Sequence, residues 1–260
     1  MKEFDGELPP WIQVVFCNTG DELPETYDFV QAFTDKLGVK ITWLERAGEK
    51  TNLPARLKLV DYDMAARNGE PFDAMLIKKK RLPNVVQRAC TSDLKVSLSH
   101  AYARGVLGWK KYSKVIGFRG DEIARFIKLF ECDKKGRDSW KREGLPPQCP
   151  MVRASVSNAI VKEFWKDQPW RLEIESWEGN CSGCFLKGTK ILVAMERKRP
   201  GVLNRMRDRE RLFRTKVSGF KKSAQFDKER TYEEIIRIAR SQIDIEDIED
   251  DRVEDCNCHD

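Results

Sequence analysis

The segment from Ile12 to Leu44 constrains the fold of this chain more than any other, because it reads as strand, polar turn, helix and strand in succession. Residues 12–16 form a short apolar run rich in β-branched residues, which is typical of a strand covered on both faces. Apolar residues then recur at helical spacing from Phe29 to Leu37, and Gly38 predicts the end of that helix before the apolar run at 39–44. This order predicts a β-α-β unit, and hence an α/β fold with a parallel sheet.

The polar turn at residues 17–22 is the first candidate ligand site. In open parallel sheets, the loops that follow the carboxyl ends of the strands hold the ligand. Thr19 or Asp21 is expected to cap the helix that begins near Pro24, so that its free backbone N–H groups can face an anion. The residues predicted to contact a nucleotide are Asn18, Thr19 and Gly20.

Four segments carry a resemblance to a known family. They read VVFCNTGDELPET with GVKITWLE at residues 14–45, RACTSDLKVSLSHAY at 88–102, VIGFRGDEIARF at 115–126 and WEGNCSGCFLKG at 177–188. In this order they resemble motifs of the phosphoadenosine phosphosulfate (PAPS) reductase family, part of the PP-loop, or adenine nucleotide alpha-hydrolase-like, superfamily. The resemblance implies a Rossmann-like parallel sheet with a helical, cysteine-bearing C-terminal region.

The phosphate loop of that family has no counterpart here. The family carries a Ser-x-Gly-Gly-Lys-[Asp/Thr]-Ser turn about one helix upstream of the strand at Ile12, whereas this sequence contains no Gly-Gly-Lys. We expect either that the first strand, loop and helix are missing from a truncated reading frame, or that tight pyrophosphate binding has been lost.

Composition divides the chain into three predicted regions. These are an N-terminally incomplete nucleotide-binding domain at 1–175, a cysteine knuckle with basic helices at 176–243, and an acidic flexible tail at 244–260. The last helix is predicted over 231–243, with Thr231 and Glu234 as a capping box. With no apolar run long enough to span a bilayer and no signal-peptide core, the protein is expected to be cytoplasmic, without a membrane partner.

Charge is unevenly distributed, although the formal net charge is only +6. Residues 187–230 are densely basic, whereas 244–255 are almost wholly acidic. One interpretation is a solvated helix followed by a flexible tail. The other is a surface that attracts tRNA or DNA, with the acidic tail as an intramolecular competitor.

Eight cysteines without a secretory signal indicate thiolate chemistry or a metal rather than a disulfide framework. Cys181 and Cys184 have the spacing of a metal-binding knuckle, and Cys90 lies at a predicted helix start that would favour its thiolate. The candidates for a fourth ligand are Cys132, Cys149, Cys256 and Cys258.

The resemblance implies a [4Fe-4S] cluster on these sulfurs. Cys90 matches the first cysteine of the family's Cys-Cys pair, but Thr91 replaces the second, so the fourth thiolate is expected from the tail, with Cys258 preferred. Zn²⁺ on the same sulfurs is the alternative.

The tail also resembles the family's mobile Glu-Cys-Gly-Leu/Ile-His ending. Cys256 lies three residues before His259, as that pattern requires, which implies that Cys256 is the catalytic nucleophile. Arg119, which ends a predicted strand at 114–118, is expected to clamp phosphate or sulfate with its planar fork, and Lys95 to add a second positive charge.

The resemblance therefore implies thiol-dependent reduction of an adenylyl sulfate to sulfite, with a thioredoxin-like electron donor. One alternative is a PP-loop enzyme that uses ATP and transfers sulfur to, or otherwise modifies, tRNA or DNA. The other is a catalytically degenerate paralogue that binds nucleotide or nucleic acid without turnover.

Overall fold

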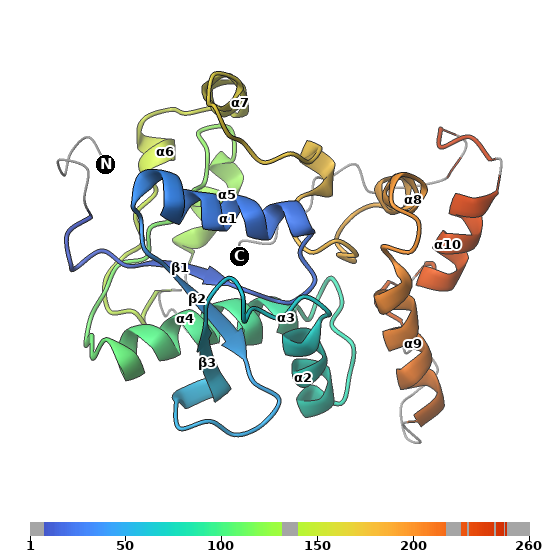
Figure 1. The fold of residues 1–260 in the computed structure, drawn as a ribbon, viewed down its shortest axis with the longest axis horizontal. Coiled ribbons are helices and arrows are strands. Elements are labelled where there is room, and N and C mark those ends of the chain that lie inside the picture. The colour runs from blue at the N-terminus through green and yellow to red at the C-terminus, as the bar shows by residue number, and fades with distance from the viewer. Residues whose placement is uncertain are drawn as a thin grey trace. The chain divides into compact units, whose positions relative to one another are not determined.

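The computed structural model describes residues 8–131, 140–216, 225–227, 229–241, 243–246 and 248 (Figure 1). They form two compact units. One contains the described residues up to Ser99 and from Glu173 onward, and the other contains His100–Leu172. Cys132, Cys256, Cys258 and most of the predicted acidic tail lie outside the described residues.

The first unit contains a three-stranded sheet in the order β1-β2-β3. β1 (Val14–Cys17) pairs in parallel with β2 (Ile41–Arg46), and α1 (Pro24–Leu37) connects them, so the predicted β-α-β unit is confirmed. β3 (Leu57–Val60) is antiparallel to β2, so the expectation of a wholly parallel sheet is wrong. The connection between β2 and β3 contains only the short 3₁₀ turn η2 (Pro54–Arg56), and a parallel return needs a longer crossover.

Helix α1 ends as its sequence predicts but begins differently. Gly38 adopts the left-handed conformation at φ 64° and donates its N–H to the carbonyl of Thr34. The predicted cap by Thr19 or Asp21 is wrong, because Leu23 occupies the N-cap position without a side-chain hydrogen bond. Thr19 and Asp21 have other partners, described below.

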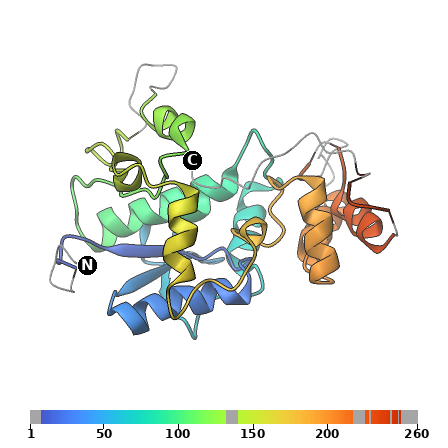
Figure 2. The same ribbon diagram turned by 90° about the horizontal axis from the view of Figure 1, so that it is seen from above.

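Two cores stabilise the first unit. The smaller core packs α1 on the sheet, where the rings of Tyr27 and Trp43 are stacked with centroids 6.0 Å apart. The helical segment α3 (Ala89–Thr91) and η3 (Ser92–Val96, a π-helix) lies on the other side of β1, and the thiol of Cys17 contacts the carbonyl of Lys95 (Figure 2).

The larger core joins segments that are far apart in the sequence. It packs α2 (Glu70–Lys79) and α3 against α8 (Thr189–Lys198), α9 (Asn204–Lys216) and α10 (Tyr232–Arg240). Its buried side chains include Phe72, Met75, Leu94, Phe185, Val193, Met206, Phe213, Tyr232 and Ile235. The capping box predicted for the last helix is confirmed in α10, because the Thr231 hydroxyl accepts from Glu234 N and Glu234 accepts from Thr231 N. α10 ends at Arg240, three residues before the predicted end.

The second unit is helical and irregular in its described residues. It contains η4 (Tyr102–Val106), α5 (Ile123–Leu129), α6 (Pro150–Arg153) and α7 (Asn158–Lys166), and α4 (Ser97–Ala101) contains the boundary with the first unit. The strand predicted at 114–118 is wrong, since this stretch forms only an isolated bridge between Val115 and Gln148. None of the helices among the described residues has the length and apolar character needed to cross a membrane.

Candidate functional site

The polar turn at residues 17–22, the elbow, is buried and held by its own side chains. Asn18 is fully buried, and its amide nitrogen donates to Glu45 Oε1 at 2.7 Å and to the carbonyl of Ala66 at 2.8 Å. Its amide oxygen accepts from the N–H of Gly20 at 2.9 Å. The amide of Asn18 therefore fixes the elbow to β2, and direct contact of Asn18 with a nucleotide stays a prediction.

Gly20 is required by the close approach of a second loop. Its φ is +79°, and a Cβ at this position would lie 2.8 Å from the backbone nitrogen of Gly69. That nitrogen donates to the carbonyl of Gly20 at 2.9 Å. Gly20 therefore lets two backbones of the protein approach each other, and its contact with a nucleotide stays a prediction.

Glu22 is a buried carboxyl group that sequence reasoning missed. It accepts hydrogen bonds from the Thr19 hydroxyl at 2.7 Å and from Tyr27 Oη at 3.3 Å. Burial raises the pKa of Glu22, while the hydrogen bond from Thr19 and the charge of Lys95 offset part of that rise. The Thr19 hydroxyl oxygen accepts from the N–H of Asp21 at 3.3 Å, within the elbow, rather than from an N–H of α1.

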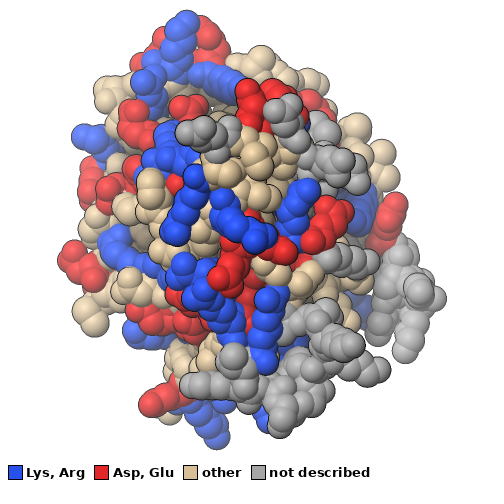
Figure 3. All heavy atoms as spheres, turned by 90° about the vertical axis from the view of Figure 1, so that its right-hand side faces the viewer, with Lys and Arg blue, Asp and Glu red and all other residues tan. Residues whose placement is uncertain are grey.

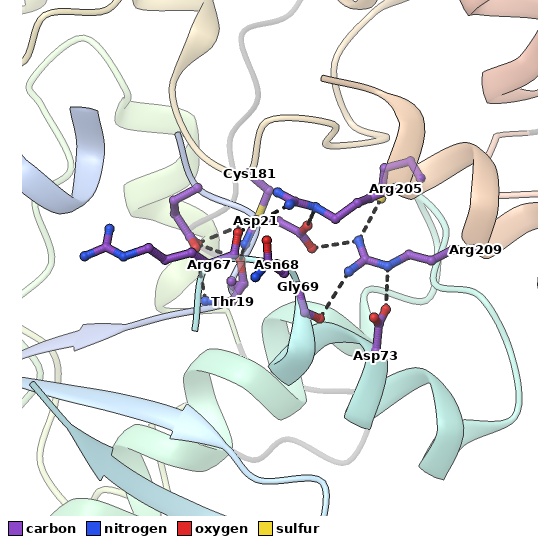
Figure 4. Close-up of polar contacts among 12 residues, drawn as sticks. Thr19, Asp21, Arg67, Asn68, Gly69, Asp73, Cys181, Arg205 and Arg209 are labelled. Atoms are coloured by element: carbon purple, nitrogen blue, oxygen red, sulfur yellow. Dashed lines mark hydrogen bonds and ion pairs between the residues drawn. The ribbon is translucent and has the colours of Figure 1, made fainter. Parts of the chain in front are cut away.

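Asp21 anchors the elbow to α9 (Figure 4). Its carboxylate accepts from Arg209 Nη1 at 2.7 Å and from Arg205 Nε at 3.0 Å. Arg209 is only 5% exposed and also donates to Asp73 Oδ1 at 2.6 Å and to the carbonyl of Gly69 at 3.1 Å. Burial alone would lower the pKa of Arg209, but the carboxylates of Asp21 and Asp73 outweigh it and raise that pKa. The guanidinium therefore stays charged and joins three segments of the chain.

The cysteine knuckle packs directly on this elbow. The N–H of Ser182 donates to the carbonyl of Asp21 at 2.8 Å, and Thr19 Oγ1 lies 3.4 Å from Cys181 Sγ. Cys181 Sγ is also 4.0 Å from Glu22 Oε1. From the other side, Tyr232 of α10 donates its hydroxyl proton to the carbonyl of Gly183 at 2.7 Å.

Five of the residues predicted for the nucleotide and metal sites are brought together by the fold. A cavity of about 20 Å³ beside the elbow is lined by both knuckle cysteines together with Thr19, Cys90 and Lys95. Two hydrophobic side chains, Phe72 and Met206, complete much of its wall. A space of this size holds about one water molecule. The cavity is a sulfur-rich chamber with one lysine in its lining.

The cysteines match a thiolate-bound group in residue type and line one cavity, but they are not arranged as a set of ligands. Three sulfurs from two distant segments reach one cavity, and thiolates are the ligands that zinc and iron-sulfur clusters prefer. No set of three or more His, Cys, Asp or Glu side chains within the described parts of the chain is already arranged around an ion position. The residues that would hold a metal or cluster here are Cys90, Cys181 and Cys184, and these side chains would have to move closer together to do so. Cys258, the predicted fourth ligand, lies outside the described residues.

Arg119 belongs to the second unit, whereas the elbow belongs to the first. Its Nε lies 2.9 Å from Asp121 Oδ1 and its Nη1 lies 3.4 Å from Glu122 Oε2. Its predicted contact with a nucleotide oxyanion stays a prediction. Cys149, one of the candidates for a fourth ligand, is buried in the same unit as Arg119.

The basic stretch that begins at Lys187 is not one continuous surface. Lys187 is fully buried, and its ammonium donates to the carbonyls of Trp177 at 3.0 Å and Gly179 at 2.7 Å. Lys198 and Arg199 donate to the fully buried carboxylate of Glu178 at 2.8 and 2.7 Å. Burial alone would raise the pKa of Glu178, but these hydrogen bonds, with one from backbone N–H, lower it to about 2. Much of this positive charge therefore stabilises the knuckle.

The helical period of α9 could have revealed the inward arginine. Leu203, Met206 and Phe213 mark the apolar face of this helix, and Arg209 falls between Met206 and Phe213 on the same face. A charged residue on an apolar face needs a buried partner of opposite charge. Nothing in the local sequence identifies Asp21 as that partner, because it lies 188 residues away.

Comparison with known proteins yields a distant relative and no assignment. The uncharacterized nin region protein ORF290 of Escherichia phage lambda is 25% identical to this chain over 197 residues. The match covers 69% of this chain and 58% of the phage protein. No protein-family model and no solved structure matches the chain. The relative's name states no activity, so the candidate function depends on the site itself.

Proposed function

We propose that this chain is a thiol-dependent sulfur enzyme of the PAPS reductase type, with a Rossmann-like fold, that reduces an adenylyl sulfate to sulfite. The observation that carries the proposal is the cysteine cavity. Cys90, Cys181 and Cys184 line it together with Lys95, directly beside the elbow that follows β1. The carboxyl end of a parallel strand is where ligands bind in open α/β sheets, so sulfur ligands and a nucleotide would meet at one edge.

The cofactor of the proposed site is a [4Fe-4S] cluster held by these three thiolates and by Cys258. When bound, such a cluster supplies one-electron redox capacity and a local charge beside the substrate. Lys95 supplies positive charge to the same cavity and offsets part of the rise in the pKa of Glu22 that burial causes. Glu22, Thr19 and Tyr27 form a hydrogen-bonded set that holds the elbow closed around Cys181. The carboxyl edge of the sheet thereby keeps a fixed shape.

The proposed nucleophile is Cys256 of the tail. Its thiolate attacks the sulfonate sulfur of the adenylyl sulfate, the bond from that sulfur to the phosphate oxygen breaks, and the nucleotide leaves with the electron pair. The product is a protein thiosulfonate. One thiolate of a dithiol donor of the thioredoxin type then attacks the sulfur of Cys256 and displaces sulfite, which gives a mixed disulfide. The donor's second thiol attacks its own sulfur in that mixed disulfide, so the Cys256 thiolate is regenerated and the donor becomes a disulfide. Arg119 is the proposed clamp for the nucleotide's anionic groups.

The test is purification under anaerobic conditions followed by iron, sulfide and zinc analysis. We expect a brown, oxygen-sensitive chromophore that Cys181→Ser or Cys184→Ser abolishes, because a cluster ligand has been removed. Cys149→Ser is the matched control, since Cys149 is a buried cysteine of the other unit, and this variant should keep the colour. If the protein contains stoichiometric zinc after reconstitution with iron and sulfide, the cluster is excluded and the site is a zinc site. Sulfite release that survives Cys256→Ser would exclude the proposed mechanism.

A further inference from the structure

A groove between α9 and α10 gathers arginines from both helices. Its volume is about 640 Å³, within the range of about 300–1,000 Å³ that ligand sites occupy. Figure 3 shows lysine and arginine side chains gathered among carboxylates on the face that carries these helices. The arginines that line the groove are Arg207, Arg211, Arg214, Arg237 and Arg240.

Helical spacing directs these arginines into the groove. Arg207, Arg211 and Arg214 follow one another at intervals of four and three residues, so they share one face of α9. Arg237 and Arg240 are three residues apart on α10. The buried Arg209 points away from this face and toward Asp21. Arg209 therefore lies on a different face of α9 from the arginines that line the groove.

The groove retains more positive charge than its carboxylates neutralise. Among the described residues, its lining contains five arginines and two glutamates, Glu233 and Glu234. Glu233 pairs with Arg211 at 2.6 Å, and Glu234 is engaged by Thr231 in the capping box of α10. Within the described residues, the structure records no ion pair for Arg237 or Arg240, and both side chains are exposed. Two guanidinium groups on one wall are thus positioned to meet an anion.

We propose that this groove binds the phosphodiester backbone of a single-stranded nucleic acid. The planar guanidinium fork matches phosphate oxygens, and arginines on both walls would contact successive phosphates of one strand. The part of the lining that the structure describes contains no aromatic side chain on which bases could stack, so binding should not depend on base sequence. The proposal stands independently of the cysteine cavity, because it uses none of that cavity's residues.

The test is fluorescence anisotropy of the full chain with a short labelled single-stranded RNA of mixed sequence, over a series of salt concentrations. Arg237→Ala with Arg240→Ala should weaken binding about tenfold at low salt. The same change should flatten the plot of log affinity against log salt by about 0.7 for each arginine removed. Arg237→Lys with Arg240→Lys keeps the charges and should retain most of the affinity. Arg81→Ala, an exposed arginine outside the groove, is the matched control and should change neither quantity.

Three results would overturn the proposal. The first is absence of RNA binding at low salt by the folded wild-type chain. The second is an affinity and a salt slope that the Arg237→Ala, Arg240→Ala variant shares with wild type, while its circular dichroism is unchanged. The third is a preference for duplex DNA or for inorganic polyphosphate over single-stranded RNA at equal phosphate concentration, which would assign the groove to a different polyanion.

Discussion

Replacing Arg209 by alanine should destabilise the first unit by about 3 kcal/mol, at the lower end of the range of about 3–5 kcal/mol for breaking a buried ion pair. The cost arises because the carboxylate of Asp21, 5% exposed, loses its shorter partner at 2.7 Å. Arg205 remains at 3.0 Å and retains part of the attraction. Asp73 contributes less, because its side chain is 49% exposed and water can solvate it. The contact between Arg209 and the ring of Phe72, at 4.4 Å from the ring centroid, is lost as well.

The measurement is urea-induced unfolding followed by circular dichroism, with linear extrapolation to zero denaturant. Arg211→Ala is the matched control, since this residue lies on the same helix but its ion pair with Glu233 is exposed. It should leave the unfolding midpoint unchanged. Arg209→Lys should recover only part of the lost stability, because one ammonium cannot reproduce the contacts with Asp21, Asp73 and Gly69 together.

A double-mutant cycle decides whether the physical reason is correct. If Arg209→Ala destabilises the protein because the buried Asp21 carboxylate loses most of its positive partner, combining it with Asp21→Asn should cost less stability than the sum of the two single changes. Additive effects would refute the reasoning. An Arg209→Ala variant as stable as Arg211→Ala would refute it as well.

Three further outcomes are expected. Gly20→Ala should lower the urea midpoint much more than Gly38→Ala does, because the new Cβ of Gly20→Ala meets the backbone of Gly69. The site of Gly38 is open, so Gly38→Ala should cost only about 1–2 kcal/mol of left-handed strain. Equal costs of the two changes would contradict this reasoning. Glu178 has a pKa lowered from 4.5 to about 2, so the stability that it contributes is present above pH 4.5 and is lost as the pH falls toward 2. The free energy of unfolding of the Glu178→Gln variant should therefore depend less on pH in that interval than that of the wild-type protein. An unchanged pH dependence would count against the ion pairs of Glu178 as its cause. Calorimetry with an adenylyl sulfate should give a high-micromolar or weaker affinity, and Arg119→Ala should weaken binding further. Tight binding that Arg119→Ala does not change would place the anion elsewhere.

Local patterns predicted the parts of this fold that local physics determines. The helix end at Gly38 and the Thr231 capping box depend on residues within a few positions of one another, so capping chemistry suffices. The β-α-β unit follows from the periodicity and order of three consecutive segments, although its two strands pair across 27 residues. The antiparallel β3 escaped prediction because a four-residue strand, Leu57–Val60, carries little periodic signal and its direction depends on the connection before it.

Sequence reasoning named five of the residues that line the cavity beside the elbow but missed the contacts that hold the elbow, and the function of this cavity stays a prediction. Cys90, Cys181, Cys184, Lys95 and Thr19 were named from motif spacing, and they line one cavity. The partners of Thr19 and Asp21 were assigned to the nearest helix, whereas the structure gives them to buried side chains, one of them on α9. Helix capping competes with long-range ion pairs for the same polar atoms, and one sequence does not reveal which partner prevails.

The link between Asp21 and Arg209 also sets an order for folding during synthesis. β1, α1 and β2 leave the ribosome early, but the elbow between β1 and α1 lacks its guanidinium partner until α9 has been translated, 188 residues after Asp21. Closing so long a loop costs little more entropy than closing one half as long, yet contacts of this separation form slowly. The apolar face of α2 is covered only when the same helix is present, because Phe72 and Met75 share one core with Met206 and Phe213. The nascent N-terminal half therefore keeps the apolar face of α2 uncovered until the C-terminal helices have been translated.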